Sequence, residues 1–502
     1  MKSPNQALKL FPVKLFPVKS FTVKLLTVNL FAALVALSTA AASAYAEEAS
    51  EVVEDYTLLD AIKQGKSLSS VRVRYETIEQ DGFFANTATS KFDDASAFTT
   101  RTLIGWQTAP FKNFSFGVQI TDVHEFNDDF NDRRDNQPEH NNGSGLSSLN
   151  KRQYPNIVDP GFTDINQLYV DWTGIKNTKL RLGRQIVNLD NVRFVGDIAF
   201  RQNTQVFDGI SVVNKSIPDT EIFASHFTKV RQVNTKLRDG NIDFVNVKYR
   251  WLPTESLTGY AYLVNVANLS QNNGNPAAAS AVAQGGNGLG GSSDIPTSAT
   301  NIRPQDTDAS SKTFGVRLDG VHIFNPTWKG LYTAEYAKQD DYRGGSPLID
   351  AHYFKLGGGV GYEVWSVRID HERLSSNDGK YAFQTPFGTN HLFQGWSDHF
   401  LATPRQGIED TYITFAGSIE KAKLYAEYHV MKADEKYQSL TGLGDKYGTE
   451  FDASIMYPFT DAVWGKVEYA KFNESDVYGT SLRGGARKGD KEIVWVTAQY
   501  SF

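Results

Sequence analysis

The carboxyl end of the chain, residues 492–502, has an apolar residue at every second position, and polar residues alternate with them from Thr497 onward. Successive side chains of an extended strand point to opposite faces. One face of this stretch is therefore apolar, with Val494, Val496, Ala498, Tyr500 and Phe502, whereas the other carries Thr497, Gln499 and Ser501. Such a face must be covered by a second layer of protein or by lipid.

The same period of two recurs along the chain from Leu68 onward. In the first segment Val71, Val73 and Tyr75 alternate with charged residues, so the charges must face water if the apolar side is covered. The other segments are 98–108, 114–124, 165–172, 179–185, 207–214, 221–229, 244–251, 257–267, 313–322, 328–337, 353–362, 366–374, 411–418, 423–431, 450–457, 463–471 and 493–502. The pattern predicts eighteen strands, and an even number brings both chain ends to one side of a membrane.

Short and long connections alternate between these segments. The long ones are 80–97, 125–164, 186–206, 230–243, 268–312, 338–352, 375–410, 432–449 and 472–492. A soluble sandwich or propeller has no reason to keep this parity, whereas a membrane barrel has short turns on one side and long loops on the other. The sequence therefore predicts an all-β fold, an 18-stranded antiparallel transmembrane β-barrel with short periplasmic turns and long extracellular loops.

The amino-terminal residues 1–46 have the pattern of a cleaved signal peptide. A basic region with Lys2, Lys9, Lys14, Lys19 and Lys24 precedes an apolar run at 25–37, and small residues end the segment at Ala46. A membrane anchor is the alternative, but Asn29 interrupts the apolar run. Residues 47–66 are expected to form a periplasmic lead-in with a short helix, and residues 67–502 are expected to form the barrel. The lead-in either plugs the channel mouth or merely precedes the first strand. The absence of cysteine suits an oxidising compartment.

Charged side chains occupy the predicted inner wall of the barrel. The candidates for pore lining and selectivity are Arg72, Arg74, Arg101, Arg181, Arg184, Arg193, Arg201, Arg250, Arg317, Asp319, Arg368, Asp370 and Glu372. Further inward candidates are Lys248, Lys329, Lys423, Lys466, Glu76, Asp171, Glu335, Glu427, Asp452 and Glu468. Guanidinium groups suit carboxylate or phosphate solutes. Alternatively, neighbours such as Arg317 with Asp319, or Arg368 with Asp370, only neutralise each other.

Two long connections, 186–206 and 375–410, are the best candidates for loops folded into the barrel. Gly196, Gly388 and Gly395 permit tight backbone, and the second loop offers a small inward aromatic cluster. The predicted constriction residues are Phe383, Pro386, Phe393, Trp396, Asp398 and Phe400. The acidic stretch 127–142 is either a solvated loop or a cation site, and the glycine-rich stretch 268–312 is expected to face solvent.

These two loops also carry the resemblance to a known family. The relevant segments are 182–196, Phe200-Arg-Gln-Asn203, Phe207-Asp208 and 383–404, together with Arg72–Glu76, Arg101 and the closing aromatic strand. They resemble the alginate export family of outer-membrane porins. The resemblance implies an 18-stranded monomeric barrel that passes anionic or other polar saccharides through an arginine-rich lumen. The chain departs from a polymer exporter in its uniformly short periplasmic turns and only mildly basic wall.

We therefore expect a channel for small polar or anionic solutes, including oligosaccharides, in the outer membrane of a Gram-negative bacterium. The alternatives are polysaccharide export within a secretion assembly, surface adhesion by the long loops, and a barrel enzyme. Asp370-His371-Glu372 suggests acid–base chemistry, but alternation sends His371 outward, and the sequence has no nucleophile elbow, zinc pair or phosphate loop. No enzyme activity, cofactor, metal or nucleic-acid partner is expected, and the acidic net charge of −6 agrees with the last point.

Overall fold

The computed structural model describes residues 56–82, 91–132, 151, 153–266, 309–439, 442–476 and 489–502. The predicted signal peptide, residues 133–142 of the acidic stretch and residues 268–308 of the glycine-rich stretch lie outside the described residues, so those expectations stay predictions. Within the described residues, no helix combines the length and apolar character that a membrane-crossing helix needs.

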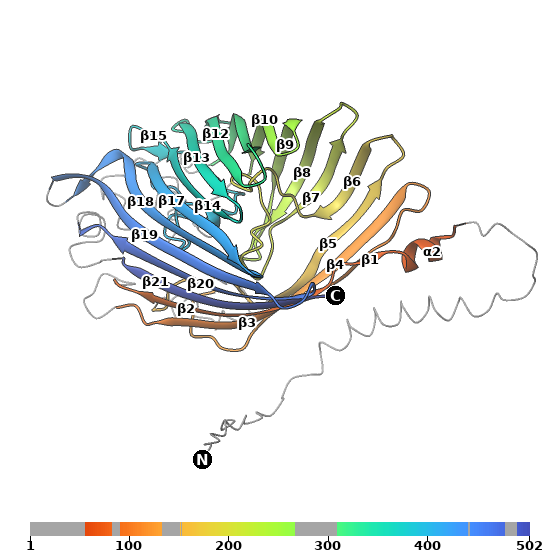
Figure 1. Ribbon diagram of the computed structural model, residues 1–502, viewed down its shortest axis with the longest axis horizontal. Helices are drawn as coiled ribbons and strands as arrows, with labels where there is room; N and C mark the ends of the chain where they lie inside the picture. Colours follow the sequence, from red (N-terminus) through yellow and green to blue (C-terminus); the bar gives the residue numbers. More distant parts are fainter. Residues whose placement is uncertain are drawn as a thin grey trace, which may run out of the picture. The chain divides into compact units, whose positions relative to one another are not determined.

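Eighteen long strands form the body of the molecule (Figure 1), and each of them overlaps one predicted segment. They are β2 (Ser70–Gln80), β3 (Ala95–Gln107), β4 (Phe114–Glu125), β5 (Phe162–Trp172), β6 (Thr178–Gln185), β7 (Val206–Asn214), β8 (Thr220–Arg231), β9 (Leu237–Leu252), β10 (Glu255–Asn265), β11 (Ser311–Ile323), β12 (Trp328–Asp341), β13 (Asp350–Tyr362), β14 (Trp365–Leu374), β17 (Ile408–Ile419), β18 (Ala422–Ser439), β19 (Gly442–Pro458), β20 (Val463–Glu474) and β21 (Lys491–Ser501). The short strands are β1 (Lys66–Ser67), β15 (Ser376–Asn377) and β16 (Tyr381–Ala382).

The sheet closes on itself. Each long strand pairs antiparallel with its neighbours in the chain, β14 pairs with β17, and the last strand pairs with the first from Ser70↔Ser501 to Gln80↔Lys491. A closed barrel leaves no row of unpaired backbone groups to face hydrocarbon, where each would cost several kcal/mol. The predicted fold class, a closed 18-stranded antiparallel barrel, is confirmed.

The two faces of the wall differ in polarity as the alternation predicts. In β2, Arg72 and Arg74 are 4% and 3% exposed, whereas Val73 and Tyr75, which alternate with them, are 37% and 45% exposed. The outward face is thus apolar and suited to lipid. Large apolar side chains are exposed near the end with the short turns, as in the aromatic bands of membrane barrels: Trp251, Phe324, Trp328, Tyr362, Phe459 and Phe502.

Two connections predicted to be long loops are instead continuations of strands. The segment 230–243 continues β8 and β9, with Lys229↔Asp239 in register, and 432–449 continues β18 and β19, with Tyr437↔Gly444 in register. The expectation of long loops was wrong here because a hairpin continues wherever cross-strand pairs remain favourable, whether or not lipid surrounds it.

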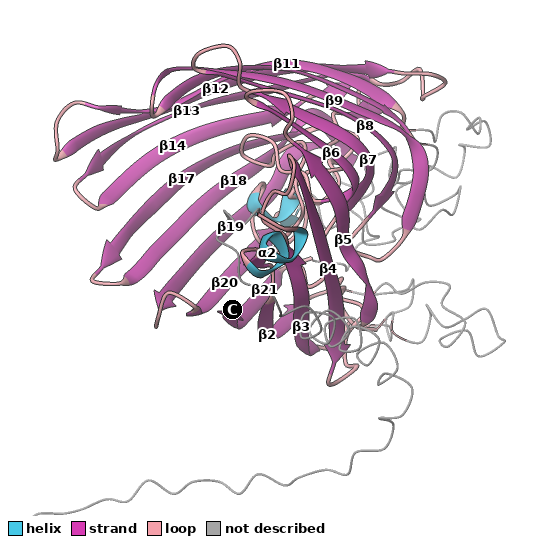
Figure 2. Cartoon of the chain, turned by 90° about the vertical axis from the view of Figure 1, so that its right-hand side faces the viewer, coloured by secondary structure: helices cyan, strands magenta, loops and turns pink. Residues whose placement is uncertain are grey.

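The lead-in forms the helix α2 (Leu58–Lys63), which begins after Thr57. The Thr57 and Asp60 side chains each bond the other's backbone N–H, a reciprocal arrangement that supplies acceptors to the helix start. The Trp106 indole donates to Ile62 O at 2.8 Å, and Ala109 N–H donates to Ala61 O at 2.8 Å. The helix is therefore attached to the β3–β4 turn, at the end of the barrel where the carboxyl terminus also lies (Figure 2).

Candidate functional site

Two loops meet inside the barrel. The β6–β7 connection and the β14–β17 connection, which contains a 3-10 turn (Asn390–Leu392), join through a parallel bridge between Val195 and Phe387. Gly196 N–H donates to Phe387 O, and Thr389 N–H donates to Val192 O, both at 2.9 Å. These are the two loops that the sequence predicts to fold inward.

Glycines allow this close approach of the two loops. A Cβ atom at position 388 would lie 2.3 Å from Arg193 O, and one at position 196 would lie 2.2 Å from Thr389 Oγ1. At position 388 only a shift of the backbone makes room for a side chain, and at position 196 the side chains of Thr389 and Val192 must move. The Gly196 and Gly388 positions in the sequence motifs therefore reflect contact between the loops.

The aromatic residues of the second loop do not form the single cluster that we predicted. Phe383, Phe387 and Phe400 are buried together with residues of the strand wall, whereas Trp396 is buried in a separate cluster with Trp495. Phe393 is only partly buried and lies 4.6 Å under the Arg193 guanidinium. The prediction fails because the loop crosses the interior, so its side chains reach different parts of the wall; Pro386 between them is partly buried.

Three arginines of β2 and β3 donate to neutral groups, and two of them, Arg72 and Arg74, thereby contact the first loop. The Arg72 guanidinium donates to Ala199 O at 2.7 Å, to Gln202 Oε1 at 2.8 Å and to Arg201 O. Arg74 donates to Phe200 O at 2.6 Å, and Arg101 donates to Gln499 Oε1 at 3.3 Å. Among the described residues, no carboxylate oxygen lies within 4.0 Å of these three guanidinium groups. Arg72 and Arg101 also stand directly opposite each other in register.

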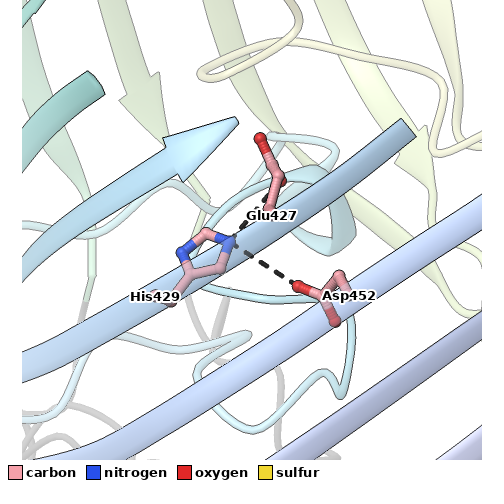
Figure 3. A group of neighbouring side chains, drawn as sticks. All are labelled: Glu427, His429 and Asp452. Carbon is pink, nitrogen blue, oxygen red and sulfur yellow. Dashed lines mark ion pairs between the residues drawn. The ribbon is translucent and has the colours of Figure 1, made fainter. Parts of the chain in front are cut away.

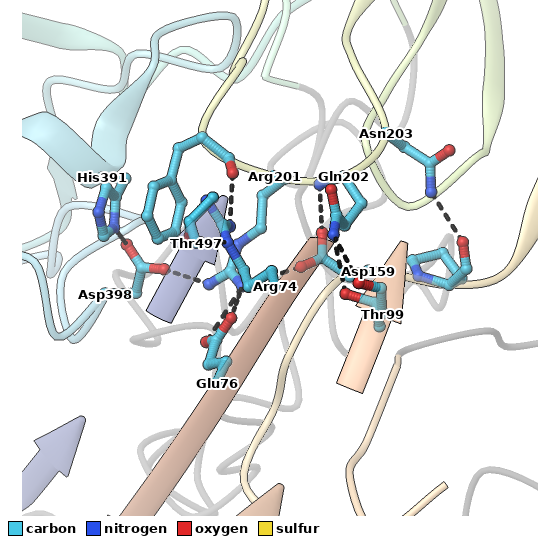
Figure 4. Close-up of polar contacts among 12 residues, drawn as sticks. Arg74, Glu76, Thr99, Asp159, Arg201, Gln202, Asn203, His391, Asp398 and Thr497 are labelled. Atoms are coloured by element: carbon cyan, nitrogen blue, oxygen red, sulfur yellow. Dashed lines mark hydrogen bonds and ion pairs between the residues drawn. The ribbon is translucent and has the colours of Figure 1, made fainter. Parts of the chain in front are cut away.

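Arg201, in the first loop, differs from these three arginines because it pairs with carboxylates (Figure 4). Its guanidinium lies 3.2 Å from Glu76 Oε2, 2.5 Å from Asp398 Oδ2 and 3.8 Å from Asp159 Oδ2. Asp398 also lies 2.9 Å from His391 Nδ1. Burial acts to raise the pKa of the Asp398 carboxyl, but His391 and Arg201 outweigh it and hold that pKa well below its usual range. Burial opposes the charge of Arg201, yet Glu76 and Asp398 raise its pKa above the usual value.

Arg193 attaches the first loop to the opposite part of the wall. Its Nε lies 2.8 Å from Glu372 Oε1 of β14, and the two side chains are 1% and 0% exposed. Nη2 donates to Gln394 Oε1 at 2.9 Å, and Tyr353 donates to Glu372 at 2.6 Å. A buried pair with this many hydrogen bonds holds the loop against β14.

The remaining predicted pore-lining arginines are mostly neutralised within the wall. The pairs are Arg181–Asp171 at 2.6 Å, Arg184–Asp208 at 2.7 Å, Arg317–Glu335 at 2.7 Å, Arg317–Asp319 at 2.6 Å and Arg368–Asp370 at 2.6 Å. For these residues the structure shows mutual pairing, which was one of the two alternatives. Arg250 is exposed near the short-turn end of β9. His371 contacts Thr411 at 2.9 Å on the outer face, apart from Asp370 and Glu372.

Some residues of the interior were not predicted from the sequence. Asp159 accepts from Gln202 N–H at 2.6 Å, and the Gln202 side chain donates to Thr99 Oγ1 at 2.9 Å, while Asn203 donates to Pro160 O at 2.8 Å (Figure 4). These bonds fix the loop tip against β3. The 200–203 motif was part of the family resemblance and could have drawn attention to Gln202 and Asn203, whereas nothing in the sequence singled out Asp159.

Comparison with protein families settles the relationship of the chain. The family model described as alginate export matches residues 69–372, more than half of the chain. The chain belongs to the alginate export family. The predicted resemblance is thus confirmed. No protein among those with curated descriptions matches the sequence.

Solved structures share the fold of this family member. OpdQ of Pseudomonas aeruginosa has a TM-score of 0.56 and 12% identity, and the match covers 88% of this chain and 98% of OpdQ. OccAB2 of Acinetobacter baumannii has a TM-score of 0.59 and 12% identity over 88% of this chain and 99% of OccAB2. OpdK of P. aeruginosa, solved with vanillate, has a TM-score of 0.56 and 11% identity over 88% and 98%. The chain is a porin-type β-barrel of the Gram-negative outer membrane.

Proposed function

We propose that this family member conducts small anionic or polar solutes, including short acidic saccharides, across the outer membrane. The observation that carries the proposal is the set of Arg72, Arg74 and Arg101, which have no carboxylate within 4.0 Å among the described residues. Directly opposed like charges destabilise a sheet, so Arg72 and Arg101 impose a cost that a solute-attracting role would explain. Positive charge concentrated on one wall raises the local concentration of anions.

The other inward arginines have a different role in this proposal. Arg317 and Arg368 are neutralised by their neighbours, and Arg193 and Arg201 hold the loops, so none of them supplies net positive charge to a passing solute. The predicted constriction residues of the second loop narrow the bore, and Phe393, partly buried beside Arg193, offers a ring face to a sugar. We further propose that the barrel works as a monomer whose outer face contacts only lipid.

The second candidate function is export of an alginate-like polymer, which the family match favours. Among the described residues, the turns at the short-turn end are too short to gate a polymer: Glu363 and Val364 alone connect β13 to β14, and Glu420 and Lys421 alone connect β17 to β18. OpdK was solved with vanillate, a small carboxylate, and that solute class fits the first proposal better.

Planar-bilayer recordings of the purified full-length protein test these proposals. The first predicts steady single-channel conductance and brief current blocks by small carboxylates and short uronate oligomers added to either side. Export predicts a conductance that small carboxylates and short oligomers leave unchanged and that only long polymer, added from the short-turn side, blocks. Absence of any conductance would overturn both.

A further inference from the structure

Three side chains with metal-binding atoms converge on the inner face of β18 and β19 (Figure 3). Glu427 and His429 are two residues apart on β18 and so share a face, and Asp452 stands directly opposite Glu427 in register. His429 Nε2 lies 3.5 Å from Glu427 Oε2 and 3.6 Å from Asp452 Oδ2. All three residues are buried, with exposures of 6%, 2% and 0% for Glu427, His429 and Asp452.

The contacts of His429 orient Nε2 toward the two carboxylates. Nδ1 lies 2.8 Å from Asp410 Oδ2 on β17. A histidine whose Nδ1–H donates to a carboxylate binds a metal through Nε2, the atom that faces Glu427 and Asp452 here. The ring also stacks on Tyr412 at 4.7 Å, which fixes its plane. Nε2 of His429 and Oδ1 of Asp452 are buried and have no hydrogen-bond partner. Such atoms are rare in folded proteins and call for a partner.

The charge around His429 is strongly unbalanced. Four carboxylates surround it, from Asp410, Glu427, Glu450 and Asp452, each at most 6% exposed. Within the described part of the chain, no lysine or arginine nitrogen comes within 4.0 Å of any of the four. Glu450 is bonded by the Ser397 N–H and hydroxyl, and Asp452 by the Trp396 N–H at 3.3 Å, but these donors carry no charge. Buried carboxylates are otherwise paired with cations or bound to metals.

We propose that Glu427, His429 and Asp452 bind a first-row divalent cation of the Zn²⁺ class, with Asp410 orienting the histidine. Ligand atoms about 2.0–2.2 Å from a tetrahedral ion lie roughly 3.3–3.6 Å apart, which agrees with both distances from Nε2. One imidazole and two carboxylates form a set that Zn²⁺ accepts, and a fourth position remains for water. The carboxylate behind the imidazole is the usual support of a metal-bound histidine.

The position of this site links the ion to the inward loop. Asp452 accepts from Trp396 N–H, and the Trp396 ring stacks on Tyr425, whose hydroxyl bonds Glu427. A bound cation would therefore fix the two side chains that hold this part of the loop. The site is independent of the anion-conducting function proposed above, since it lies among acids and not among the unpaired arginines.

Zn²⁺ binding by the full-length protein in detergent tests the site, after refolding with chelator and then with ZnCl₂. Equilibrium dialysis with metal analysis should find one Zn²⁺ per barrel, and Co²⁺ should give the visible spectrum of a tetrahedral ion. Asp410→Asn should weaken binding roughly 10- to 100-fold. Asp452→Asn and Glu427→Gln should weaken it further. His226→Gln is the matched control, because His226 faces one carboxylate, Asp243 at 2.7 Å, in an exposed position; it should leave binding unchanged.

Thermal unfolding gives a second test, because Asp452→Asn should raise the melting temperature without metal and abolish the rise that Zn²⁺ causes. Without metal, Asp452→Asn should melt above the wild type because it relieves the repulsion with Glu427, and this also shows that the variant folds. Zn²⁺ should raise the melting temperature of the wild type and leave that of Asp452→Asn unchanged. Failure of the wild type to bind Zn²⁺, or equal binding by wild type and both ligand variants, would overturn the proposal.

Discussion

Two parts of the inner wall use arginine in different ways. On β11 and β14, Arg317 and Arg368 each contact a carboxylate of the same face. On β2 and β3, Arg72, Arg74 and Arg101 instead donate to loop carbonyls and side-chain oxygens. The charges on β11 and β14 stabilise the structure, since Glu372 of β14 also holds Arg193 of the first loop. In the proposed function, Arg72, Arg74 and Arg101, which have no carboxylate partner among the described residues, act on a passing solute.

The largest effect on stability is expected from removing the charge of Glu372. Glu372→Gln leaves Arg193 buried without its acid, and removal of one partner of a buried pair costs about 3–5 kcal/mol. Urea titration of the protein in detergent or vesicles should show this loss in the free energy of unfolding. Glu221→Gln, which removes the acid of the solvent-exposed Lys215–Glu221 pair, should cost less than about 1 kcal/mol. Equal effects of the two substitutions would contradict the assigned role of Glu372.

Acid should weaken the loop attachment on the β2 side. The pKa of Asp398 in the folded protein lies below the value of about 3.9 for an unfolded aspartate. Such a carboxyl stabilises the folded state fully above its unfolded pKa, and this stabilisation is lost as the pH falls toward the folded pKa. Hydrogen exchange of the loop should therefore be constant from neutral pH to about pH 5 and accelerate, relative to the intrinsic rate, below about pH 4.

Asp398→Asn tests whether this carboxyl causes the acid sensitivity. The variant should lose part of the pH dependence below about pH 4, whereas Asp378→Asn should keep it. Asp378 lies in the same loop but its side chain is exposed. An unchanged acid profile in Asp398→Asn would show that other groups hold the loop.

A smaller effect is expected where the two loops touch. Gly388→Ala places a methyl group 2.3 Å from Arg193 O, so the loops must separate at a cost of about 1–3 kcal/mol. Gly259→Ala is the control, because nothing lies within 4 Å of a Cβ atom there. The free energy of unfolding should fall in the first variant and stay nearly unchanged in the second. A neutral Gly388→Ala would mean that the loops do not depend on this contact.

Much of the fold follows from the sequence because one physical rule, alternation against lipid, acts on every strand. The same rule failed at 230–243 and 432–449, where strands continue beyond the range that hydropathy alone marks, as at Tyr437. The inward loops were predicted from their glycines and aromatic residues. Their attachment points were not, because the contact of Arg193 with Glu372 joins residues far apart in the chain.

The division between paired and unpaired arginines was beyond sequence reasoning for a related reason. Alternation gives the direction of Arg74 and Arg368 alike, but only the cross-strand register and the loop path decide which one meets an acid. The cluster around His429 was missed although a signal existed. Glu427 and Asp452 were predicted to point inward, and the same alternation places His429 beside Glu427; their register with β19 was not available from the pattern.

The reversal potential of single channels under a KCl gradient tests the central claim most directly. The claim is that Arg72, Arg74 and Arg101 of β2 and β3 give the barrel a preference for anions. The wild type should favour Cl⁻, and the combined Arg72→Gln, Arg74→Gln and Arg101→Gln variant should lose most of that preference. The combined Arg317→Gln and Glu335→Gln variant, which removes an ion pair from the other wall, should keep it. A wild-type channel that prefers K⁺, or a preference for Cl⁻ that survives loss of all three arginines, would contradict the account.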